Sequence, residues 1–245
     1  MLSRSSGKHN MQHSRDDVPM SQLVGLTTDQ IGAPNGNVVK FQISREAGIL
    51  ECEGYMKAGG GGGIFHFMAN LNYIAAMRSL GYRELDNEKT FALSLHDVTT
   101  GFVRDMQALG YTDVKYDKLM AMRIHGVSPE FVRETRALGL STDSLDQLIA
   151  MRIHGVTPEF VREIKAAGVD GGSIDKLVAF RIHGVSPEFV RQVRSLGFPK
   201  VTGDQLVAMR IHGITPEFIQ RMSGRGMKDL TIDQLVSLKI HGIAN

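Results

Sequence analysis

The sequence predicts a mainly α-helical protein, an α-solenoid-like stack of 29-residue αα-hairpin repeats that follows a small N-terminal antiparallel β-meander. The motif Arg-Ile-His-Gly at 123–126 recurs every 29 residues, beginning again at Arg152, Arg181 and Arg210 and, with lysine first, at Lys239. A self-similar period of about 20 to 50 residues is typical of stacked architectures. Helix start and stop residues occupy fixed places in each copy. Upstream, apolar and polar residues alternate with the period of strands.

Composition limits the class of protein. The chain has 245 residues, 42% of them hydrophobic, which suits one or two domains with a real core. A net charge of +2 gives no strong attraction to nucleic acid or to a membrane. No apolar run approaches the roughly 18 residues that cross a bilayer, and the first twenty residues lack the apolar centre of a secretory signal. We therefore expect a soluble chain without membrane insertion. The compartment stays open, as does the question whether the chain is part of a longer protein.

Three segments follow one another. Residues 1–36 are polar and without periodicity, and we expect a flexible arm. Residues 37–69 predict a small antiparallel sheet, because VVKFQIS and ILECEGYM alternate in polarity and IFHFM follows as a third strand. REAG at 45–48 predicts the first turn, and the glycine run at 59–63 a flexible hairpin connection. Three strands alone are marginally stable, so the sheet should pack against helices.

The tandem helical repeats occupy residues 70–245, with weaker copies of the motif before residue 111. Each copy predicts two short helices. In the copy at 144–168, Ser144 caps the first helix, Gly155 closes it, and Thr157 with Pro158 opens the second. Gly168 ends the second helix. Much of the motif therefore consists of residues that start and end helices.

The first helix of each copy has an arginine within its apolar arc, which consists of Leu145, Leu148, Ile149, Met151 and Ile153 in the second copy. A lone charge is costly to bury there. We expect these arginines to run between neighbouring repeats and to meet carboxylates or helix-end carbonyls. The preferred partners are the glutamates of the Pro-Glu pairs. The arginines are Arg123, Arg152, Arg181 and Arg210, and the glutamates are Glu130, Glu159, Glu188 and Glu217. An anion-binding track is the less favoured interpretation, since each arginine comes with an acidic residue.

The histidines of the motif raise the possibility of metal sites. They are His125, His154, His183, His212 and, in the worn copy, His241. Equivalent residues of stacked helix layers lie about 10 Å apart, whereas zinc ligands lie about 2 Å from a common ion. A histidine in the last turn of a helix also suits its negative end. We therefore predict helix capping or packing between repeats rather than metal binding.

Catalytic machinery is not evident. HExxH and GxSxG are absent, and the glycine run lacks the Lys-Ser/Thr that completes a P-loop. The single cysteine, Cys52, excludes an intramolecular disulfide and fits a small buried residue better than a nucleophile. We predict no catalytic residue, no cofactor and no metal site, and hence a protein that is not an enzyme.

The chain resembles a bacterial repeat family. The segment FQISREAGILECEGYMKAG, the later GGIFHFMANLNYIAAMRSLGY and the tandem AMRIHGV-(S/T)-PEFVRE units are similar to the C-terminal extensions of membrane metallopeptidases of the β-lactam-sensor type and to related stand-alone proteins. The resemblance covers about residues 38–245. It implies a bacterial origin and a sensing or regulatory setting. One location that fits this setting is outside the cytoplasm. It brings no catalytic residue, because the peptidase motif and the membrane helices are absent here.

These features predict a non-enzymatic protein-interaction or scaffold module with a regulatory or self-assembling role. Helical repeats present long surfaces to proteins or peptides, and a free sheet edge or the repeat ends could bind a second copy. The alternative is a nucleic-acid-binding helical repeat protein. That function needs a continuous basic face with varying base readers. The repeated surface positions hold glutamate as often as arginine, which argues against it.

Overall fold

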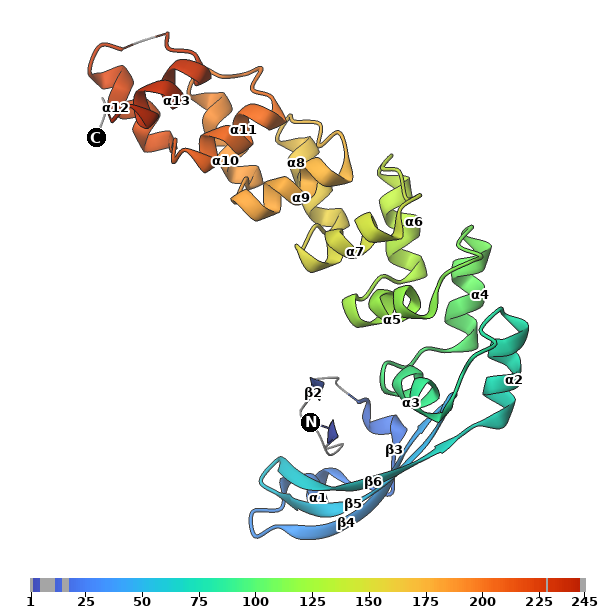
Figure 1. The fold of residues 1–245 in the computed structure, drawn as a ribbon. Helices are drawn as coiled ribbons and strands as arrows, with labels where there is room; N and C mark the ends of the chain where they lie inside the picture. The colour runs from blue at the N-terminus through green and yellow to red at the C-terminus, as the bar shows by residue number, and fades with distance from the viewer. Residues whose placement is uncertain (1, 5–11, 15–17, 228, 243–245) are drawn as a thin grey trace. The chain divides into compact units, whose positions relative to one another are not determined.

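The computed structural model describes residues 2–4, 12–14, 18–227 and 229–242 (Figure 1). The chain divides into two compact units, residues 1–124 and 125–245, and each is described by itself. The described residues form thirteen α-helices and one four-stranded antiparallel sheet, besides a two-stranded pairing of β1 (Leu2–Arg4) with β2 (Gln12–Ser14). The prediction of a mainly helical protein with a small antiparallel sheet is confirmed.

The sheet of the first unit has the order β3-β4-β5-β6. Its strands are β3 (Leu23–Val24), β4 (Asn37–Arg45), β5 (Gly48–Lys57) and β6 (Gly60–Ala69). The last three coincide with the predicted sheet segment, and the predicted turn joins β4 to β5. β6 pairs with β5 on one side, and in the described part of the chain no strand pairs with its other side.

Regular structure extends into the segment predicted as a flexible arm. Besides β3, it contains the 3₁₀ turn η1 (Met20–Gln22) and the helix α1 (Thr28–Gly32). Thr27 and Gln30 form a reciprocal capping box that starts α1. Val18 and Leu23 pack against the core of the sheet, which is why this stretch is ordered despite its polar composition. Residues 1, 5–11 and 15–17 of the predicted arm lie outside the described residues.

The prediction for the glycine run is wrong. The hairpin turn consists of Ala58 and Gly59, both with positive φ, and the next four glycines belong to strand β6. The reason is close strand approach. A Cβ at Gly63 would lie 2.2 Å from the Glu53 carbonyl oxygen, and one at Gly61 would lie 2.2 Å from Met56 Sδ. These glycines therefore allow strand pairing that a side chain would block.

The inner face of the sheet packs against a helix, as predicted. Ile43, Leu50 and Cys52 form its buried cluster. The ring of Phe91 in α3 (Asn87–Leu95) stacks on Phe65 of β6 with centroids 5.3 Å apart and meets Phe67 edge-on at the same distance. The sheet and the first helices thus share one core.

The β4–β5 turn also fixes two helix ends in the first unit. The Arg45 guanidinium donates to the carbonyls of Ser94 and Leu95 at the end of α3. The Glu46 carboxylate accepts from the Thr100 N–H at 2.9 Å and from its hydroxyl. Opposite charges therefore lie at the negative end of one helix and the positive end of the next. The second of these helices is α4 (Thr100–Ala108). The other helices of this unit are α2 (Leu71–Ser79), which precedes α3, and α5 (Tyr116–His125), which follows α4.

Helices of the second unit pack in two series. α7 contacts α9, α9 contacts α11 and α11 contacts α13, while α6, α8, α10 and α12 contact one another in the same consecutive way (Figure 1). Their bounds are α6 (Pro129–Ala137), α7 (Leu145–Ile153), α8 (Pro158–Ala166), α9 (Ile174–His183), α10 (Pro187–Ser195), α11 (Gly203–Ile211), α12 (Pro216–Gly224) and α13 (Ile232–Ile240). Every helix of the odd-numbered series ends in a copy of the Arg-Ile-His-Gly motif, with lysine first in α13, and every helix of the even-numbered series begins with a Pro-Glu-Phe sequence.

The predicted helix punctuation is found at the predicted residues. The Thr157 side chain accepts from the Phe160 N–H at the start of α8, with Pro158 in the first turn. Ser144 caps α7 in the same way. Gly155 takes a positive φ of 68° just after α7, where its lack of a Cβ is needed.

Candidate functional site

The arginines of the motif tie each helix of the odd-numbered series to the one before it. Arg152 Nε donates to the His125 carbonyl at 3.2 Å, Arg181 Nε to His154 at 3.2 Å, and Arg210 Nε to His183 at 3.3 Å. Within the first unit, Arg123 Nε donates to the His96 carbonyl at 3.1 Å. Each acceptor is a carbonyl at a helix C-terminus, where a cation is favoured.

The same guanidinium groups lie over aromatic rings. Arg181 is 5.0 Å from the Phe160 ring centroid, and Arg210 is 5.0 Å from that of Phe189. Arg152 and Arg123 lie 5.2 Å and 5.1 Å from their phenylalanines, Phe131 and Phe102. Each arginine therefore combines a hydrogen bond with a cation–π contact to the preceding copy of the motif.

The preferred partner predicted for these arginines is wrong, and the second one, a helix-end carbonyl, is correct. Glu130 pairs with Arg133 at 3.4 Å and Glu188 pairs with Arg191 at 3.0 Å, each within its own helix. The backbone at the start of α6, followed by the Ser128 side chain, lowers the pKa of Glu130, and the Thr215 side chain, followed by the backbone, lowers the pKa of Glu217. Glu130 and Glu217 thus interact with the N-termini of their own helices.

The opposite ends of the odd-numbered helices are also linked. Gln147 Nε2 donates to the Asp175 carboxylate at 3.0 Å, and the Lys176 ammonium pairs with Asp204. Both links join the first turn of one helix to the first turn of the next. Since the arginine contacts join last turn to last turn, α7, α9 and α11 lie parallel and side by side.

One face of these parallel helices is apolar and open to solvent. The isoleucine of the motif is 54% exposed at Ile153, 56% at Ile182, 55% at Ile211 and 59% at Ile240. Valines one turn earlier are half-buried on the same face, at i, i+4 spacing. We call this surface the isoleucine band: Ile153, Ile182, Ile211 and Ile240 with Val178, Val207 and Val236.

The predicted apolar arc of the first helix is therefore too wide. Leu148 and Met151 are fully buried, whereas Ile153 is exposed. Met151 and Ile153 are two residues apart, about 160° on the helix once the shorter arc is taken, so they face opposite sides. Burial follows one side of the helix only, and hydrophobicity alone does not distinguish the two.

The isoleucine band lies between a row of acidic residues on one edge and a row of basic residues on the other. Asp146, Asp175, Asp204 and Asp233 occupy the first turns of α7, α9, α11 and α13. Arg152, Arg181, Arg210 and Lys239 occupy the last turns. The arginines donate to neutral carbonyls, so these contacts leave their positive charges uncompensated. At the acidic edge, Asp204 pairs with the cation Lys176, whereas Asp175 accepts from the neutral Gln147 amide.

Histidines of the motif interact with the next repeat through their backbone carbonyls. The carbonyls of His125, His154 and His183 accept the arginine hydrogen bonds, and His154 is also the C-cap residue of α7. The side chains of His125, His154, His183 and His241 are exposed, and that of His212 is half-buried. Within the described ranges, no group of three or more His, Cys, Asp or Glu residues is placed to hold a metal ion.

The described helices are all too short or too polar to span a lipid bilayer.

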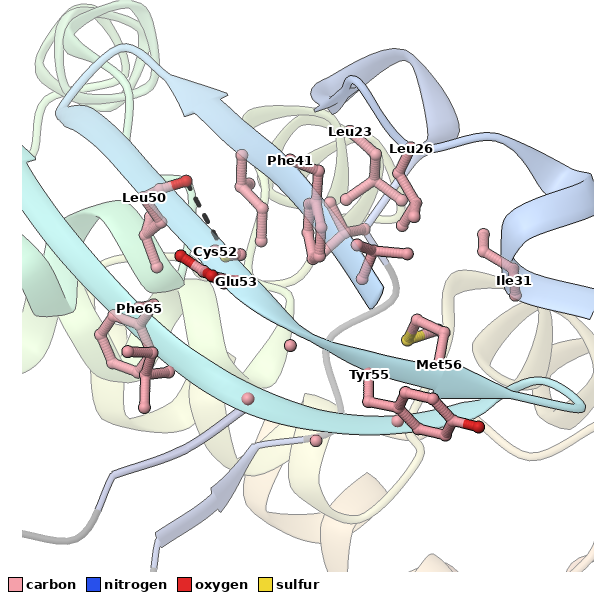
Figure 2. A pocket seen from close by; sticks show the side chains of 18 of the residues that line it. Leu23, Leu26, Ile31, Phe41, Leu50, Cys52, Glu53, Tyr55, Met56 and Phe65 are labelled. Carbon is pink, nitrogen blue, oxygen red and sulfur yellow. Dashed lines mark hydrogen bonds between the residues drawn. The ribbon is translucent and has the colours of Figure 1, made fainter. Parts of the chain in front are cut away.

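A second surface feature lies in the first unit. A cavity of about 640 Å³ opens on the inner face of the sheet, lined mainly by apolar side chains and by the glycines of β6 (Figure 2). Small-molecule sites usually add a few convergent polar groups. Here Glu53 pairs with Lys40 at 3.0 Å, Arg45 donates to α3, and burial raises the pKa of the Cys52 thiol. The Tyr55 hydroxyl, also in the lining, donates to the Asn35 carbonyl at 2.9 Å. Among the described residues, the polar side chains of the cavity are therefore engaged within the chain, and the isoleucine band is the stronger candidate site.

In comparisons with known proteins, no protein-family model matches the chain, and no curated protein matches it.

Proposed function

We propose that this protein is a non-enzymatic interaction module whose second unit is a solenoid of 29-residue αα-hairpins that binds a protein partner through the isoleucine band. The observation that carries the proposal is the exposure of one isoleucine in every copy of the motif. Exposed apolar residues scattered singly need no explanation. A regular row of them on packed helices is the kind of apolar surface that marks an interaction site.

The rigidity of the row supports the proposal. Each isoleucine directly follows an arginine or lysine at a helix end, and in three copies that arginine is held by a carbonyl and a phenylalanine ring. The side chains are therefore presented by a fixed backbone. A preformed surface loses little conformational entropy on binding, which favours affinity.

The nucleic-acid alternative has one observation in its favour, the row of Arg152, Arg181, Arg210 and Lys239. The acidic row at the other edge of the isoleucine band opposes it, because phosphates would be repelled there. The resemblance to extensions of bacterial sensor peptidases fits a regulatory scaffold better than a nucleic-acid reader. A bacterial setting is part of the proposal.

Site-specific photo-crosslinking in the source cell tests the proposal. A photoreactive phenylalanine analogue would replace Ile182 or Ile211 on the isoleucine band. Matched controls would replace Glu163 or Gln192, which are exposed on the even-numbered helices. We expect covalent protein adducts from the first pair and none from the second.

Two results would contradict the proposal. Adducts of equal yield from both pairs would show that the isoleucine band is not a distinct surface. Adducts consisting of nucleic acid, together with binding that weakens steeply with salt, would favour the alternative function.

A further inference from the structure

We infer that the partner of the isoleucine band is an amphipathic α-helix that lies along the band, with apolar residues repeating every seven positions and with an acidic flank and a basic flank. This inference rests on the proposed function and names the class of partner. Three observations lead to it: the spacing of the isoleucines, the helical form of the described elements that carry the band, which offers no strand edge, and the two charged edges.

The spacing suits a helix. Packed helices lie about 8–10 Å apart, so neighbouring isoleucines on α7, α9, α11 and α13 are separated by about that distance. Seven residues of α-helix rise about 10.5 Å. A partner helix of about three heptads therefore brings one apolar residue to each gap along the band, and the residues at i, i+3 and i+4 widen its apolar stripe.

Other peptide forms fit less well. An extended strand needs unpaired backbone groups on its receptor, and the backbone of α7, α9 and α11 is engaged in helical hydrogen bonds and end contacts. A polyproline segment docks on grooves lined by aromatic rings, and the isoleucine band consists of isoleucine and valine. A helix satisfies its own backbone and needs only side-chain contacts, which are the contacts that this surface offers.

Charge decides the flanks of the partner. The Arg152, Arg181, Arg210 and Lys239 edge attracts an acidic flank. At the other edge, Asp175, which accepts from the neutral Gln147 amide, and Asp233 attract a basic flank. A helix with two acidic flanks or two basic flanks would meet like charges along one edge. The two edges also set the direction in which a partner helix lies, because reversing it exchanges the flanks.

A displayed library of random 24-residue peptides, selected on the full chain, provides an unbiased test. We expect the enriched sequences to show the seven-residue apolar period with one acidic and one basic flank. The tightest peptide would then be synthesised and its affinity measured by fluorescence anisotropy against Ile182→Gln, Ile211→Gln and the double variant. The control is Ile64→Gln, at an isoleucine that is 77% exposed on the sheet.

Loss of each isoleucine contact is expected to weaken binding by about tenfold, and of both by about a hundredfold. Ile64→Gln should leave the affinity unchanged. Changing the acidic flank of the peptide to lysine should weaken binding as well, and salt should reduce the difference. These exposed positions carry little folding energy, and thermal unfolding of each variant would verify that.

The outcomes separate the two proposals. Enrichment of proline-rich or strand-like peptides that still depend on Ile182 and Ile211 would overturn the helical partner and leave the proposed function standing. Enriched peptides that are indifferent to both isoleucines, or no enrichment at all, would overturn both proposals. Self-association of the chain that is abolished by the double variant would replace the helix by a second copy.

Discussion

Arg181 shows how a single residue holds two layers of helices together. Its Nε donates to the His154 carbonyl, its guanidinium lies over Phe160, and its stem crosses between α7 and α9. A hydrogen bond from a charged donor and a cation–π contact are each worth about 1 kcal/mol or more where solvent is partly excluded. The geometry needs the planar fork of arginine, which a lysine lacks.

We predict that Arg181→Ala lowers the free energy of unfolding by about 1–2 kcal/mol. This is the sum of the hydrogen bond and the cation–π contact, reduced because solvent screens this exposed side chain. Arg181→Lys should recover part of the loss. The control Arg162→Ala, at an exposed position of α8, should cost less than about 0.5 kcal/mol. Urea unfolding followed by circular dichroism measures all three. Equal effects at Arg181 and Arg162 would contradict a structural role for the motif arginine.

Tyr73 is the buried phenol of the first unit. Its hydroxyl donates to the Val98 carbonyl at 2.8 Å, and burial, followed by the charge of Glu46, raises its pKa well above the ordinary value of 10.0. Because the folded-state pKa is raised, the neutral form is favoured in the folded chain. Its contribution to stability is therefore complete below pH 10 and is lost as the pH rises further.

We predict that Tyr73→Phe costs about 1–2 kcal/mol at neutral pH, since the Val98 carbonyl is left buried without its donor. The difference between the variant and the unchanged chain should shrink above pH 10, where ionisation destabilises only the chain with the phenol. Thermal melts from pH 7 to 11 would measure this. A difference that stays constant with pH would show that Tyr73 does not titrate as the burial implies.

At the scale of helices, the glycines that follow the helices meet two separate requirements, which Gly184 after α9 and Gly139 after α6 distinguish. Gly184 has a φ of 70°, and a Cβ there would lie 2.9 Å from an Arg210 guanidinium nitrogen. Gly139 has a φ of 79°, and a Cβ there would meet no atom within 4 Å. The pair therefore separates backbone strain from crowding against the next arginine.

We predict that Gly139→Ala costs about 1–2 kcal/mol, the strain of a left-handed residue. Gly184→Ala should cost more, because it also displaces Arg210. In the background Arg210→Ala, the two glycine substitutions should become equal in cost. Denaturant unfolding of the four variants forms the test. A Gly184→Ala cost that survives unchanged in that background would exclude the arginine as its cause.

The limits of these helices were predictable from the sequence, because their signals are local. Thr157, Pro158 and Gly155 each act on the backbone within one turn. The choice between a carboxylate and a helix-end carbonyl as the partner of Arg181, and the exposure of Ile182, were not predictable, because both depend on which side of the helix meets the neighbouring layer. Strand β3 has two residues, too few for a periodic signal, and is held by the packing of Leu23.

In the sheet, too, local patterns were predictable and contacts with the facing strand were not. Alternation in β4 and β5 was predictable, since Ile43, Leu50 and Cys52 face one side. The strand made of Gly60–Gly63 was not, because glycine has no side chain to show a period and its general preference is for turns. Its role comes from the facing strand, whose Glu53 carbonyl leaves no space for a Cβ at Gly63.

At the scale of the whole molecule, contacts in the inferred solenoid are those of nearest neighbours, such as α7 with α9 and α9 with α11. Stability in such a stack is approximately a sum of local terms and interfaces between neighbours. Damage to one layer should therefore spread to the adjacent layers and fade beyond them. Because the chain divides into two compact units, we also expect damage in the second unit to leave the stability of the sheet in the first unit unchanged.

Hydrogen exchange on two matched core variants tests this architecture. Phe180 in α9 and Leu93 in α3 are both fully buried, and truncating either to alanine costs about 2–5 kcal/mol. Phe180→Ala should speed amide exchange in α9 and in its neighbours α7 and α11, while β4–β6 keep their protection. Leu93→Ala should do the reverse, exposing the sheet amides and leaving α9–α11 protected. If either variant instead lowered protection uniformly along the chain, the protein would unfold as one cooperative body, and the nearest-neighbour stack inferred from the motif would be wrong.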